Sequence, residues 1–465
     1  MPNSGRLRTG DPSLLRQLNL SVVMHYLRER APVYRAQLAE ITGLNKTTVS
    51  SLVSELIAQQ YVQESGQSDA TRINGRTGRP AVMLELNRSA GCAIAAEVGV
   101  GFLSVAVADF ASEIIWRQTE RTRHLGQEAI IERLLALLQS ALRHGLGVTQ
   151  RGLGIAVGVP ALVELDRGAI LFAPNLNWHD VPLGSILRGA FDLPIFLDNE
   201  ANLAALAETQ YGVARNERDV LYISAGVGLG GGIVRDGRIY RGVSGFAGEF
   251  GHMRVDVGGL AAELPREVAC GCGSIGCWET YVSERALFAD IARRVADGRP
   301  SVLAWAVRSA EPALTVPLVV DAAQAGDEVA IAALENVGHA LGAGIASLVN
   351  ALNPELVALG GSLSLAGEFF LPVIERELAQ RALRWSRLAA RVAIAQHRFD
   401  ACVMGGIATV IQSSQLALSL PAQGGMPALG MEASAGGEPA KNRYAVEASQ
   451  AKGGDRGQHQ HQGVN

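Results

Sequence analysis

The sequence predicts a winged helix-turn-helix module at the N-terminus, followed by a larger α/β body of two lobes. Two short amphipathic segments separated by a glycine-containing turn predict the first part. Apolar, strand-like runs that alternate with helical stretches from about residue 89 predict the second. The chain has 465 residues, of which 48% are hydrophobic and 18% charged. This is enough apolar material for buried cores, which excludes a wholly disordered protein.

Charge is distributed unevenly along the chain. The formal net charge is −4, yet residues 1–88 contain 11 Lys and Arg against 7 Asp and Glu. This N-terminal part therefore carries +4 and the remaining 377 residues carry −8. A basic module attached to an acidic body indicates that the N-terminal part contacts a polyanion.

Three helices are expected in the N-terminal module. Residues 13–30 place apolar side chains at helical spacing, a second helix is expected over residues 35–42, and a third over about 46–59. The turn between the last two contains Gly43, and the third helix opens with a polar edge suited to the major groove of DNA. The residues expected to contact DNA from this edge are Asn45, Lys46, Thr47, Thr48 and Ser51.

Two short strands are expected after these helices, over residues 61–66 and 81–87. The loop between them carries Arg72, Arg76 and Arg79, which we expect to contact phosphate or the minor groove. A three-helix bundle with a flexible linker is the alternative. The helix spacing, the polar edge and the arginine-bearing wing together favour DNA binding, so residues 1–88 are assigned to a winged helix.

The body is expected to consist of a first lobe over residues 89–205 and a second over 206–413, with a cleft between them. Helices are expected within residues 283–296, 318–324 and 328–352 of the second lobe, and its last helix over 405–413. From about residue 421 the chain becomes rich in Gly, Ala, Gln and Ser without an apolar period. Residues 414–465 are therefore expected to be a disordered tail.

Three of the five cysteines lie within eight residues, at Cys270, Cys272 and Cys277, and His252 precedes them. An odd number of cysteines clustered in this way is a poor disulfide framework. Three thiolates and one imidazole suit tetrahedral zinc, whereas buried free thiols would not explain cysteines interspersed with glycines. We expect a structural Zn²⁺, because four protein donors leave no position open for an activated water.

A glycine-rich segment, Gly226–Gly232, follows the strand expected at Val220–Ile223. Backbone N–H groups in a turn of this kind can approach a phosphate, although glycines also permit close packing. Carboxylates and amides at residues 198–202, Glu249 and Glu279 are suited to hydrogen bonds with sugar hydroxyls. Each of these taken alone is more typical of a helix cap or a surface group.

Together these motifs resemble the ROK family, which contains sugar kinases and sugar-responsive repressors. The residues that carry the resemblance are Glu249–His252, Cys270–Glu279, Asn199–Asn202, Ala173–Leu176 with Trp178, and Asn353–Gly361. The resemblance extends from about residue 12 to 413 and, with the winged helix, is strongest for the repressor branch of xylose-type regulators. It implies an actin-like body of two ribonuclease-H-like lobes, the fold of the sugar kinases.

The resemblance also implies where ligands bind. The sugar pocket would contain Asn175, Asn199, Glu200, Glu249, His252 and Glu279, and the zinc ligands would be His252, Cys270, Cys272 and Cys277. His252 would serve both sites. Zinc would then fix the loop that carries Glu249 and Glu279, and so preorganise the pocket.

Three departures from the family's kinases disfavour catalysis. The kinase phosphate loop Asp-x-Gly-Gly-Thr is matched by Glu97-Val-Gly-Val-Gly101, and Gly-Thr-Gly by Gly226-Val-Gly228. The catalytic aspartate of Asn-Asp-Ala-Asn is matched by Glu200, whose extra methylene displaces the carboxylate. A displacement of about 1 Å can cost roughly 100-fold in rate. We therefore expect no kinase activity and no catalytic residue, with Glu200 as a degenerate base.

The expected function is that of a sugar-responsive transcriptional regulator, a repressor of a carbohydrate-utilisation operon. Its expected partners are operator DNA, a sugar effector and a second copy of the chain, in a homodimer or higher homo-oligomer. An active ROK sugar kinase and a protein–protein interaction module are the alternatives. The sequence shows no signal peptide and no apolar run of membrane-spanning length, so a cytoplasmic location without a membrane partner is expected.

Overall fold

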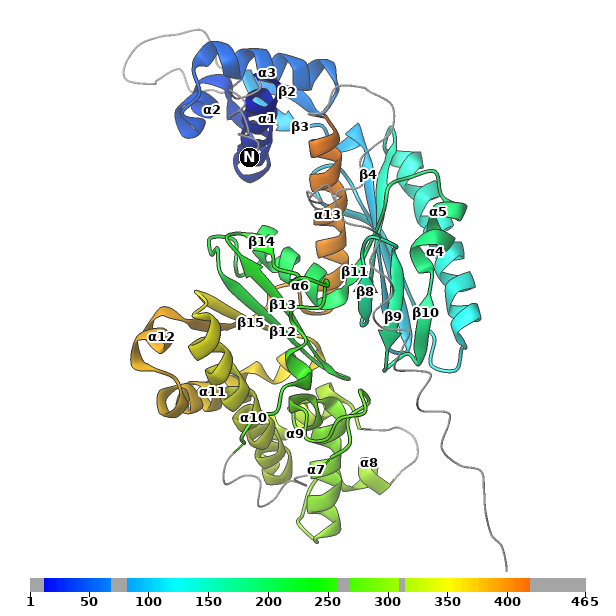
Figure 1. Ribbon diagram of the computed structural model, residues 1–465, viewed down its shortest axis with the longest axis vertical. Coiled ribbons are helices and arrows are strands. Elements are labelled where there is room, and N and C mark those ends of the chain that lie inside the picture. Colours follow the sequence, from blue (N-terminus) through cyan, green and yellow to red (C-terminus); the bar gives the residue numbers. More distant parts are fainter. Residues whose placement is uncertain (1–11, 68–81, 258–267, 309–313, 419–465) are drawn as a thin grey trace, which may run out of the picture. The chain divides into compact units, whose positions relative to one another are not determined.

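The computed structural model of the protein describes residues 12–67, 82–257, 268–308 and 314–418 (Figure 1). The predicted wing residues Arg72, Arg76 and Arg79 lie outside the described residues, as does most of the predicted tail.

Residues 12–90 form an N-terminal module, called the head below. Its helices and strands follow in the predicted order, and their ends differ from the predicted ones by at most one residue. A two-residue strand, β1, was not predicted because two residues carry no alternating pattern; it joins an antiparallel sheet of order β1-β3-β2. The elements are α1 (Pro12–Arg30), β1 (Val33–Tyr34), α2 (Arg35–Thr42), α3 (Lys46–Ala58), β2 (Val62–Gln67) and β3 (Val82–Leu86).

Local chemistry sets the turn between α2 and α3. Gly43 ends α2 in the left-handed region, at φ 69°, which glycine adopts without steric cost. The side chain of Asn45 accepts a hydrogen bond from the backbone N–H of Thr48 at 2.7 Å, and so caps α3. Leu38 of α2 and Val49 and Leu52 of α3 are buried.

The first lobe is built on a five-stranded sheet of order β11-β7-β4-β5-β6, in which β4, β7 and β11 are parallel. Alternate residues of β4 face opposite sides: Ile94 packs with α4, whereas Ala93 and Ala95 face α13. The elements of this lobe are β4 (Cys92–Gly99), β5 (Phe102–Ala108), β6 (Ile114–Arg121), α4 (Gln127–Val148), β7 (Gly152–Val159), β8 (Leu162–Glu164), β9 (Ala169–Ala173), β10 (Trp178–Val181), α5 (Leu183–Ala190) and β11 (Ile195–Asn199).

The second lobe repeats this plan, with a sheet of order β14-β13-β12-β15-β16. Val220 and Tyr222 pack beneath α6, and the alternate residues Leu221 and Ile223 face the large core around α10. The elements are α6 (Glu200–Gln210), β12 (Val220–Ala225), β13 (Leu229–Arg235), β14 (Arg238–Ile239), α7 (Glu284–Ala296), α8 (Ala304–Arg308), α9 (Val316–Gln324), α10 (Glu328–Leu352), β15 (Leu356–Gly360), α11 (Gly367–Arg381), α12 (Arg384–Ala389) and β16 (Arg391–Ile394).

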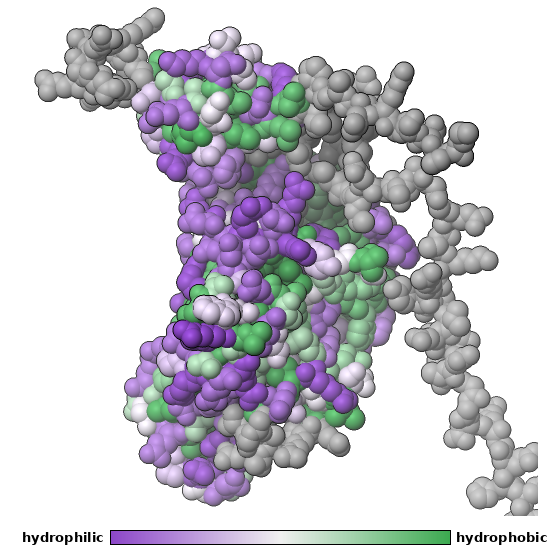
Figure 2. All heavy atoms as spheres, turned by 60° about the vertical axis from the view of Figure 1, so that its left-hand side comes forward, coloured by the Kyte–Doolittle hydropathy of each residue, from purple (hydrophilic) through white to green (hydrophobic). Residues whose placement is uncertain are grey.

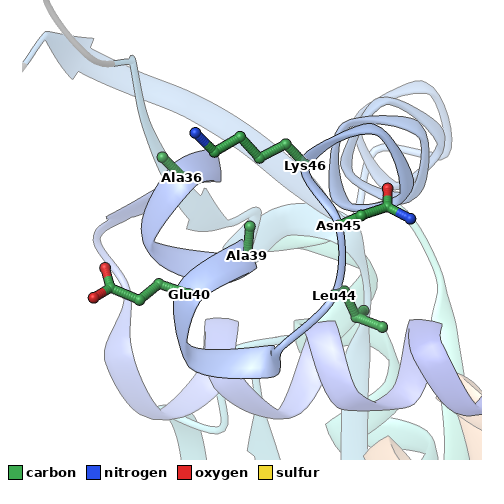
Figure 3. Close-up of a pocket in the computed structure, with 6 residues that line it drawn as sticks. All are labelled: Ala36, Ala39, Glu40, Leu44, Asn45 and Lys46. Carbon is green, nitrogen blue, oxygen red and sulfur yellow. The ribbon is translucent and has the colours of Figure 1, made fainter.

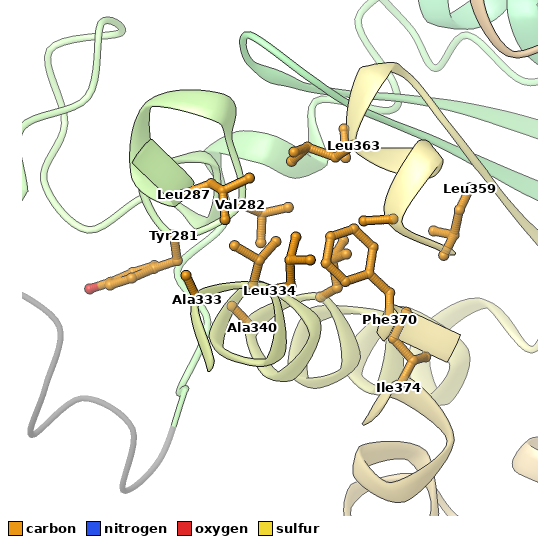
Figure 4. Close-up of a cluster of buried hydrophobic side chains, with 14 of the residues drawn as sticks. Tyr281, Val282, Leu287, Ala333, Leu334, Ala340, Leu359, Leu363, Phe370 and Ile374 are labelled. Carbon is orange, nitrogen blue, oxygen red and sulfur yellow. The ribbon is translucent and has the colours of Figure 1, made fainter. Parts of the chain in front are cut away.

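Helix α10 is the centre of the second core. Leu334 on α10, Leu287 on α7, and Phe370 and Ile374 on α11 meet there (Figure 4). Among the described residues α10 is the one helix long and apolar enough to cross a membrane, but 78% of its most apolar window is buried inside the protein. Its hydropathy is accounted for by this core.

The last helix, α13 (Ala401–Leu418), is longer than predicted and packs on β4 and β7 of the first sheet. The sequence assigned residues 405–413 to the second lobe because they follow it in the chain. A domain boundary drawn along the sequence cannot show that the last helix packs on the first sheet, because this packing joins segments far apart in the chain. Helix α13 also crosses α6 closely, and a side chain at Gly405 would collide with the carbonyl oxygen of Leu203.

Candidate functional site

A histidine and three cysteines come together in the second lobe, as predicted. The Nδ1 atom of His252 lies 3.6 Å from the sulfur of Cys270, and the sulfurs of Cys272 and Cys277 lie 3.7 Å apart. All four donor atoms lie within 4.8 Å of one another. This arrangement is suited to holding a single metal ion.

Tight turns bring the three cysteines together. The backbone N–H of Cys270 donates to Ser274 at 2.8 Å, and Gly273 lies in the left-handed region at φ 89°. After Cys277, the fully buried Trp278 donates its indole N–H to the carbonyl oxygen of Ala340 on α10 at 2.8 Å. The cluster is thus anchored to the largest core of the lobe.

His252 faces two ways. Its Nδ1 atom lies against Cys270, and its Nε2 atom lies 3.7 Å from a carboxylate oxygen of Glu249. Burial raises the pKa of Glu249, His252 lowers it, and the nearby negative charge of Glu279 raises it again. One imidazole therefore connects the cysteine cluster to a carboxylate.

Glu279 makes a second connection. One of its oxygens lies 3.6 Å from the sulfur of Cys270, and the other accepts a hydrogen bond from the backbone N–H of Leu229 at 3.0 Å. A side chain at Gly228 would meet this carboxylate at 2.6 Å and the amide nitrogen of Asn175 at 2.9 Å. Asn175, from the first lobe, and Glu279 therefore converge beside Gly228.

Asn199 and Glu200 lie where β11 passes into α6. The side chain of Asn199 accepts from the backbone N–H of Ala201 at 2.7 Å and donates to the carbonyl of Ala161 at 3.1 Å. Both ends of this amide are thus engaged by the backbone, and the structure uses Asn199 as a helix cap. A role for Asn199 in direct sugar contact remains a prediction.

Glu200 keeps an unused acceptor. One of its carboxylate oxygens is buried without a hydrogen-bond partner among the described residues. Burial, together with the neighbouring carboxylate of Glu249, raises the pKa of Glu200 to about 7. A buried polar atom without a partner is costly, so this oxygen is suited to bind a hydroxyl of a ligand.

The predicted glycine-rich turn is smaller than expected. Gly226–Gly228 form a turn, but Gly230, Gly231 and Gly232 belong to strand β13. A side chain at Gly232 would come within 2.7 Å of the carbonyl oxygen of Ala201 on α6. The alternative explanation, close packing, accounts for these three glycines.

Glu97, which is aligned with the aspartate of the kinase phosphate loop, is a weakened acid. Burial, followed by the negative charges of Glu200 and Asp400, raises the pKa of Glu97 to about 8. A second buried carboxylate, Asp198, pairs with Arg241 and accepts from the amide of Asn202 at 3.1 Å. Sequence reasoning missed Arg241, because one arginine on an irregular segment carries no local pattern.

The predicted DNA-contacting edge of α3 is accessible. Asn45, Lys46, Thr47 and Ser51 are exposed, and Thr48 is half-buried. Lys46 extends over Ala36 at the start of α2, beside a shallow groove that Asn45 and Leu44 also line (Figure 3). The predicted DNA-contacting residues therefore lie on a different part of the chain from the predicted sugar and metal residues.

Comparison with protein families matches residues 93–413 to the ROK family. This covers more than two thirds of the sequence. The chain belongs to the ROK family. Among ROK relatives, it is similar to the xylose repressor of Caldicellulosiruptor bescii, with 33% identity over 404 residues that span 86% of this chain and 97% of that protein.

Solved ROK structures show the same fold. A ROK family transcriptional regulator, described as a homologue of the Escherichia coli MLC protein, matches with a TM-score of 0.72 and 28% identity over 87% of this chain and 98% of its own. A ROK glucokinase from Streptomyces griseus, solved with glucose and AMPPNP, matches with a TM-score of 0.60 and 29% identity. The match spans the whole length of that kinase and 69% of this chain. The predicted two-lobed sugar-kinase fold is confirmed.

Proposed function

We propose that this ROK protein is a sugar-responsive transcriptional repressor whose winged-helix head binds operator DNA. The observation that carries the proposal is the head itself. The ROK match begins at residue 93, after the head, and the glucokinase is covered completely by 69% of the chain. The repressor and regulator relatives, by contrast, match over 86% and 87% of the chain.

The proposed sugar site consists of Asn175, Glu200, Glu249, His252 and Glu279, with Asn199 holding the helix that carries Glu200. Carboxylate and amide groups bind sugar hydroxyls through paired hydrogen bonds. The free oxygen of Glu200 and the convergence of Asn175 with Glu279 beside Gly228 support this assignment. The expected effector class is a monosaccharide.

Zinc is the proposed occupant of the His252, Cys270, Cys272 and Cys277 cluster. Donors at tetrahedral zinc lie roughly 3.8 Å apart for two sulfurs and roughly 3.6 Å for sulfur and nitrogen. The observed separations are 3.7 Å and 3.6 Å. When bound, zinc supplies a structural cross-link. The role of the chain's own residues is to hold His252, and through it Glu249, in a fixed orientation.

The head is proposed to place the polar edge of α3 in the major groove, where Lys46, Thr47 and Ser51 contact base edges or phosphates. Arg72, Arg76 and Arg79 are proposed to add phosphate or minor-groove contacts. Two copies of the chain would bind two half-sites, as helix-turn-helix proteins do.

Buried side chains provide a physical connection between the head and the sugar site. Val403 and Ile407 of α13 belong to the same hydrophobic cluster as Leu20 and Leu27 of α1. At its start, α13 carries Cys402, whose sulfur lies 2.2 Å from where a side chain at Gly158 would begin. Burial and then the carboxylates of Glu97 and Glu200 raise the pKa of that thiol. A movement of the residues around Glu200 would therefore change the packing of α13.

An ROK sugar kinase is the second candidate, favoured by the likeness to the Streptomyces griseus glucokinase. Three features disfavour it. Gly101 stands where the kinase phosphate loop has its threonine, Val227 replaces a phosphate-binding hydroxyl, and Glu200 replaces the catalytic aspartate. We propose that the protein binds sugar without phosphorylating it.

One experiment separates these functions. A thermal-shift panel of pentoses, hexoses and amino sugars identifies the effector, and the stabilising sugar is then tested in two assays. We expect it to change the affinity of the protein for fragments of its own upstream DNA, and we expect no ATP turnover with the same sugar. Steady ATP-dependent phosphorylation without DNA binding would overturn the proposal.

A further inference from the structure

Helix α1 of the head is apolar on two opposite sides. Successive residues of a helix are separated by about 100°, so Leu20, Val23 and Leu27 share one face and point into the core. Leu15, Leu18 and Val22 lie on the opposite face, called the outer stripe below. They are 57%, 55% and 38% exposed. On the face of the head that Figure 2 shows, apolar side chains lie between hydrophilic ones.

The outer stripe has the spacing of a helix-pairing seam. Its members follow at intervals of three and four residues, and His25 and Glu29 continue the same interval. These two polar residues lie 3.6 Å apart and end the apolar part of the stripe. A seam of this kind packs well against a second helix with the same spacing.

Charge favours a second copy of the chain as that helix. Asn19 and Ser21 beside the stripe are uncharged, and Arg16 is paired with Glu55. Glu29, at the end of the stripe, is paired with His25 and with Arg215 of the same chain. Two identical stripes related by a twofold axis therefore meet without like-charge repulsion.

The exposed apolar side chains of α12 are different in this respect. Trp385 and Leu388, with Leu383 just before the helix, are 76%, 60% and 68% exposed, but Arg384 and Arg387 lie among them. Pairing of that patch with itself would bring four arginines together.

We propose that the outer stripe of α1 packs against the same stripe of a second copy of this chain and fixes the separation of the two heads. This inference rests on the proposed function, because two half-sites require two heads at a defined distance. The stripe is small beside the roughly 800 Å² that each partner contributes to a standard interface. It therefore adds to another contact between the two chains that already holds them together.

The test compares full-length Leu18→Glu with wild type on two DNA fragments. The fragments are selected by the wild-type protein from a random pool and carry either both half-sites or one. We expect Leu18→Glu to weaken binding to two half-sites by about tenfold or more and to leave binding to one half-site unchanged. Mixing Leu18→Glu with Leu18→Lys chains should restore tight binding to two half-sites. Glutamate and leucine have similar helix propensities, so α1 should remain folded.

Leu388→Glu on α12 is the matched control, because it makes the same change on an exposed residue of another helix. Equal behaviour of Leu18→Glu and Leu388→Glu on both fragments would overturn the proposal. Equal weakening of Leu18→Glu on both fragments would also do so, since it would indicate local damage to the head.

A second measurement needs no DNA and so separates this proposal from the proposed function. Full-length Leu18→Cys and Leu388→Cys proteins are treated with a short bis-maleimide, with wild type as the background for the natural cysteines. Cross-linked dimers of Leu18→Cys in excess of both other proteins are expected. Equal cross-linking of all three would count against the stripe, even if the protein represses transcription.

Discussion

Glu249 and Glu279 show how few atoms separate the cysteine cluster from the proposed sugar site. Glu279 lies 3.6 Å from the sulfur of Cys270 and Glu249 lies 3.7 Å from the imidazole of His252. Each carboxylate contacts the cluster through one of its two oxygens. The residues that would hold a metal and those that would hold a sugar are therefore in direct contact.

Replacing Glu249 should separate sugar sensing from DNA binding. Glu249→Gln keeps the shape of the side chain and removes its charge, and a hydrogen bond to a charged group contributes about 1.5–3 kcal/mol. We expect sugar binding about 10- to 100-fold weaker and unchanged DNA binding in the absence of sugar. Calorimetry with the sugar and gel shifts without it measure the two. Loss of DNA binding as well would assign Glu249 a structural role.

Glu97 should make the stability of the protein depend on pH. Its pKa is raised to about 8 in the folded protein, from an ordinary value of 4.5. The folded state therefore binds the proton more tightly than the unfolded chain. The stability that this provides is complete below about pH 4.5 and is lost as the pH rises through about 8.

Glu97→Gln imitates the protonated form at every pH. At pH 9 we expect the free energy of unfolding of the variant to exceed that of wild type by about a few kcal/mol, and its unfolding temperature to be higher. At pH 5 the two proteins should differ little. Thermal unfolding at the two pH values measures this. An equal change at both would mean that the carboxylate is ionised in the folded protein throughout.

Strand β13 and helix α6 show how an element positions a site residue. Gly230 and Gly232 let the start of α6 lie directly on the strand, and Glu200 is the first residue of that helix. Asn199 caps the same helix by accepting from the N–H of Ala201. Glu200 lies between these two residues, so the cap also fixes its position.

Gly232→Ala should disturb this contact. The new methyl group would lie 2.7 Å from the carbonyl oxygen of Ala201 and 2.9 Å from the side chain of Ala205. Overpacking of this kind costs about 1–3 kcal/mol, and sugar binding should weaken as α6 shifts. Gly147→Ala in α4 is the control, because its methyl group would meet nothing within 4 Å. Thermal unfolding should show Gly147→Ala unchanged or slightly stabilised, and similar losses in both variants would refute the packing argument.

Removal of the metal should affect one local segment, the turn that carries the three cysteines. Cys272→Ser or a strong chelator should release the turn between Cys270 and Cys277, and with it the orientation of His252. We expect the sugar-induced rise in unfolding temperature to disappear while DNA binding by the head persists. Protein purified without added metal should contain close to one equivalent of zinc by elemental analysis. A sugar response that survives in metal-free protein would show that the site does not preorganise the pocket.

At the scale of the whole molecule, a hydrophobic cluster joins α1 of the head to α13. This cluster provides a physical route for coupling between the proposed sugar site and the head. Helix α13 packs against α6 as well as against the first sheet, so it contacts the helix that begins at Glu200. A sugar that prefers one arrangement of these helices would bias the head toward one arrangement.

Coupling of this kind must be reciprocal. If the sugar lowers the affinity for DNA by some factor, DNA must lower the affinity for the sugar by the same factor, typically 5- to 150-fold. Titrating sugar with and without DNA, and DNA with and without sugar, gives the two factors. Factors that differ beyond error would mean that another component, such as a change in oligomeric state, contributes.

The sequence by itself determined the elements of the head, the alternation of strands and helices in the body, and the membership of the cysteine–histidine cluster. Periodicity, capping residues and the spacing of metal-ligand residue types express these features within short segments. Gly43 and Asn45, for example, set the turn before α3 without help from distant residues.

Only the tertiary structure decided that α13 returns to the first sheet, that the amide of Asn199 donates to the carbonyl of Ala161, that three glycines of the expected turn form a strand against α6, and that Arg241 pairs with Asp198. Each of these depends on groups far apart in the chain. Their packing and pairing energies exist only once the chain has folded, so no local pattern in the sequence encodes them.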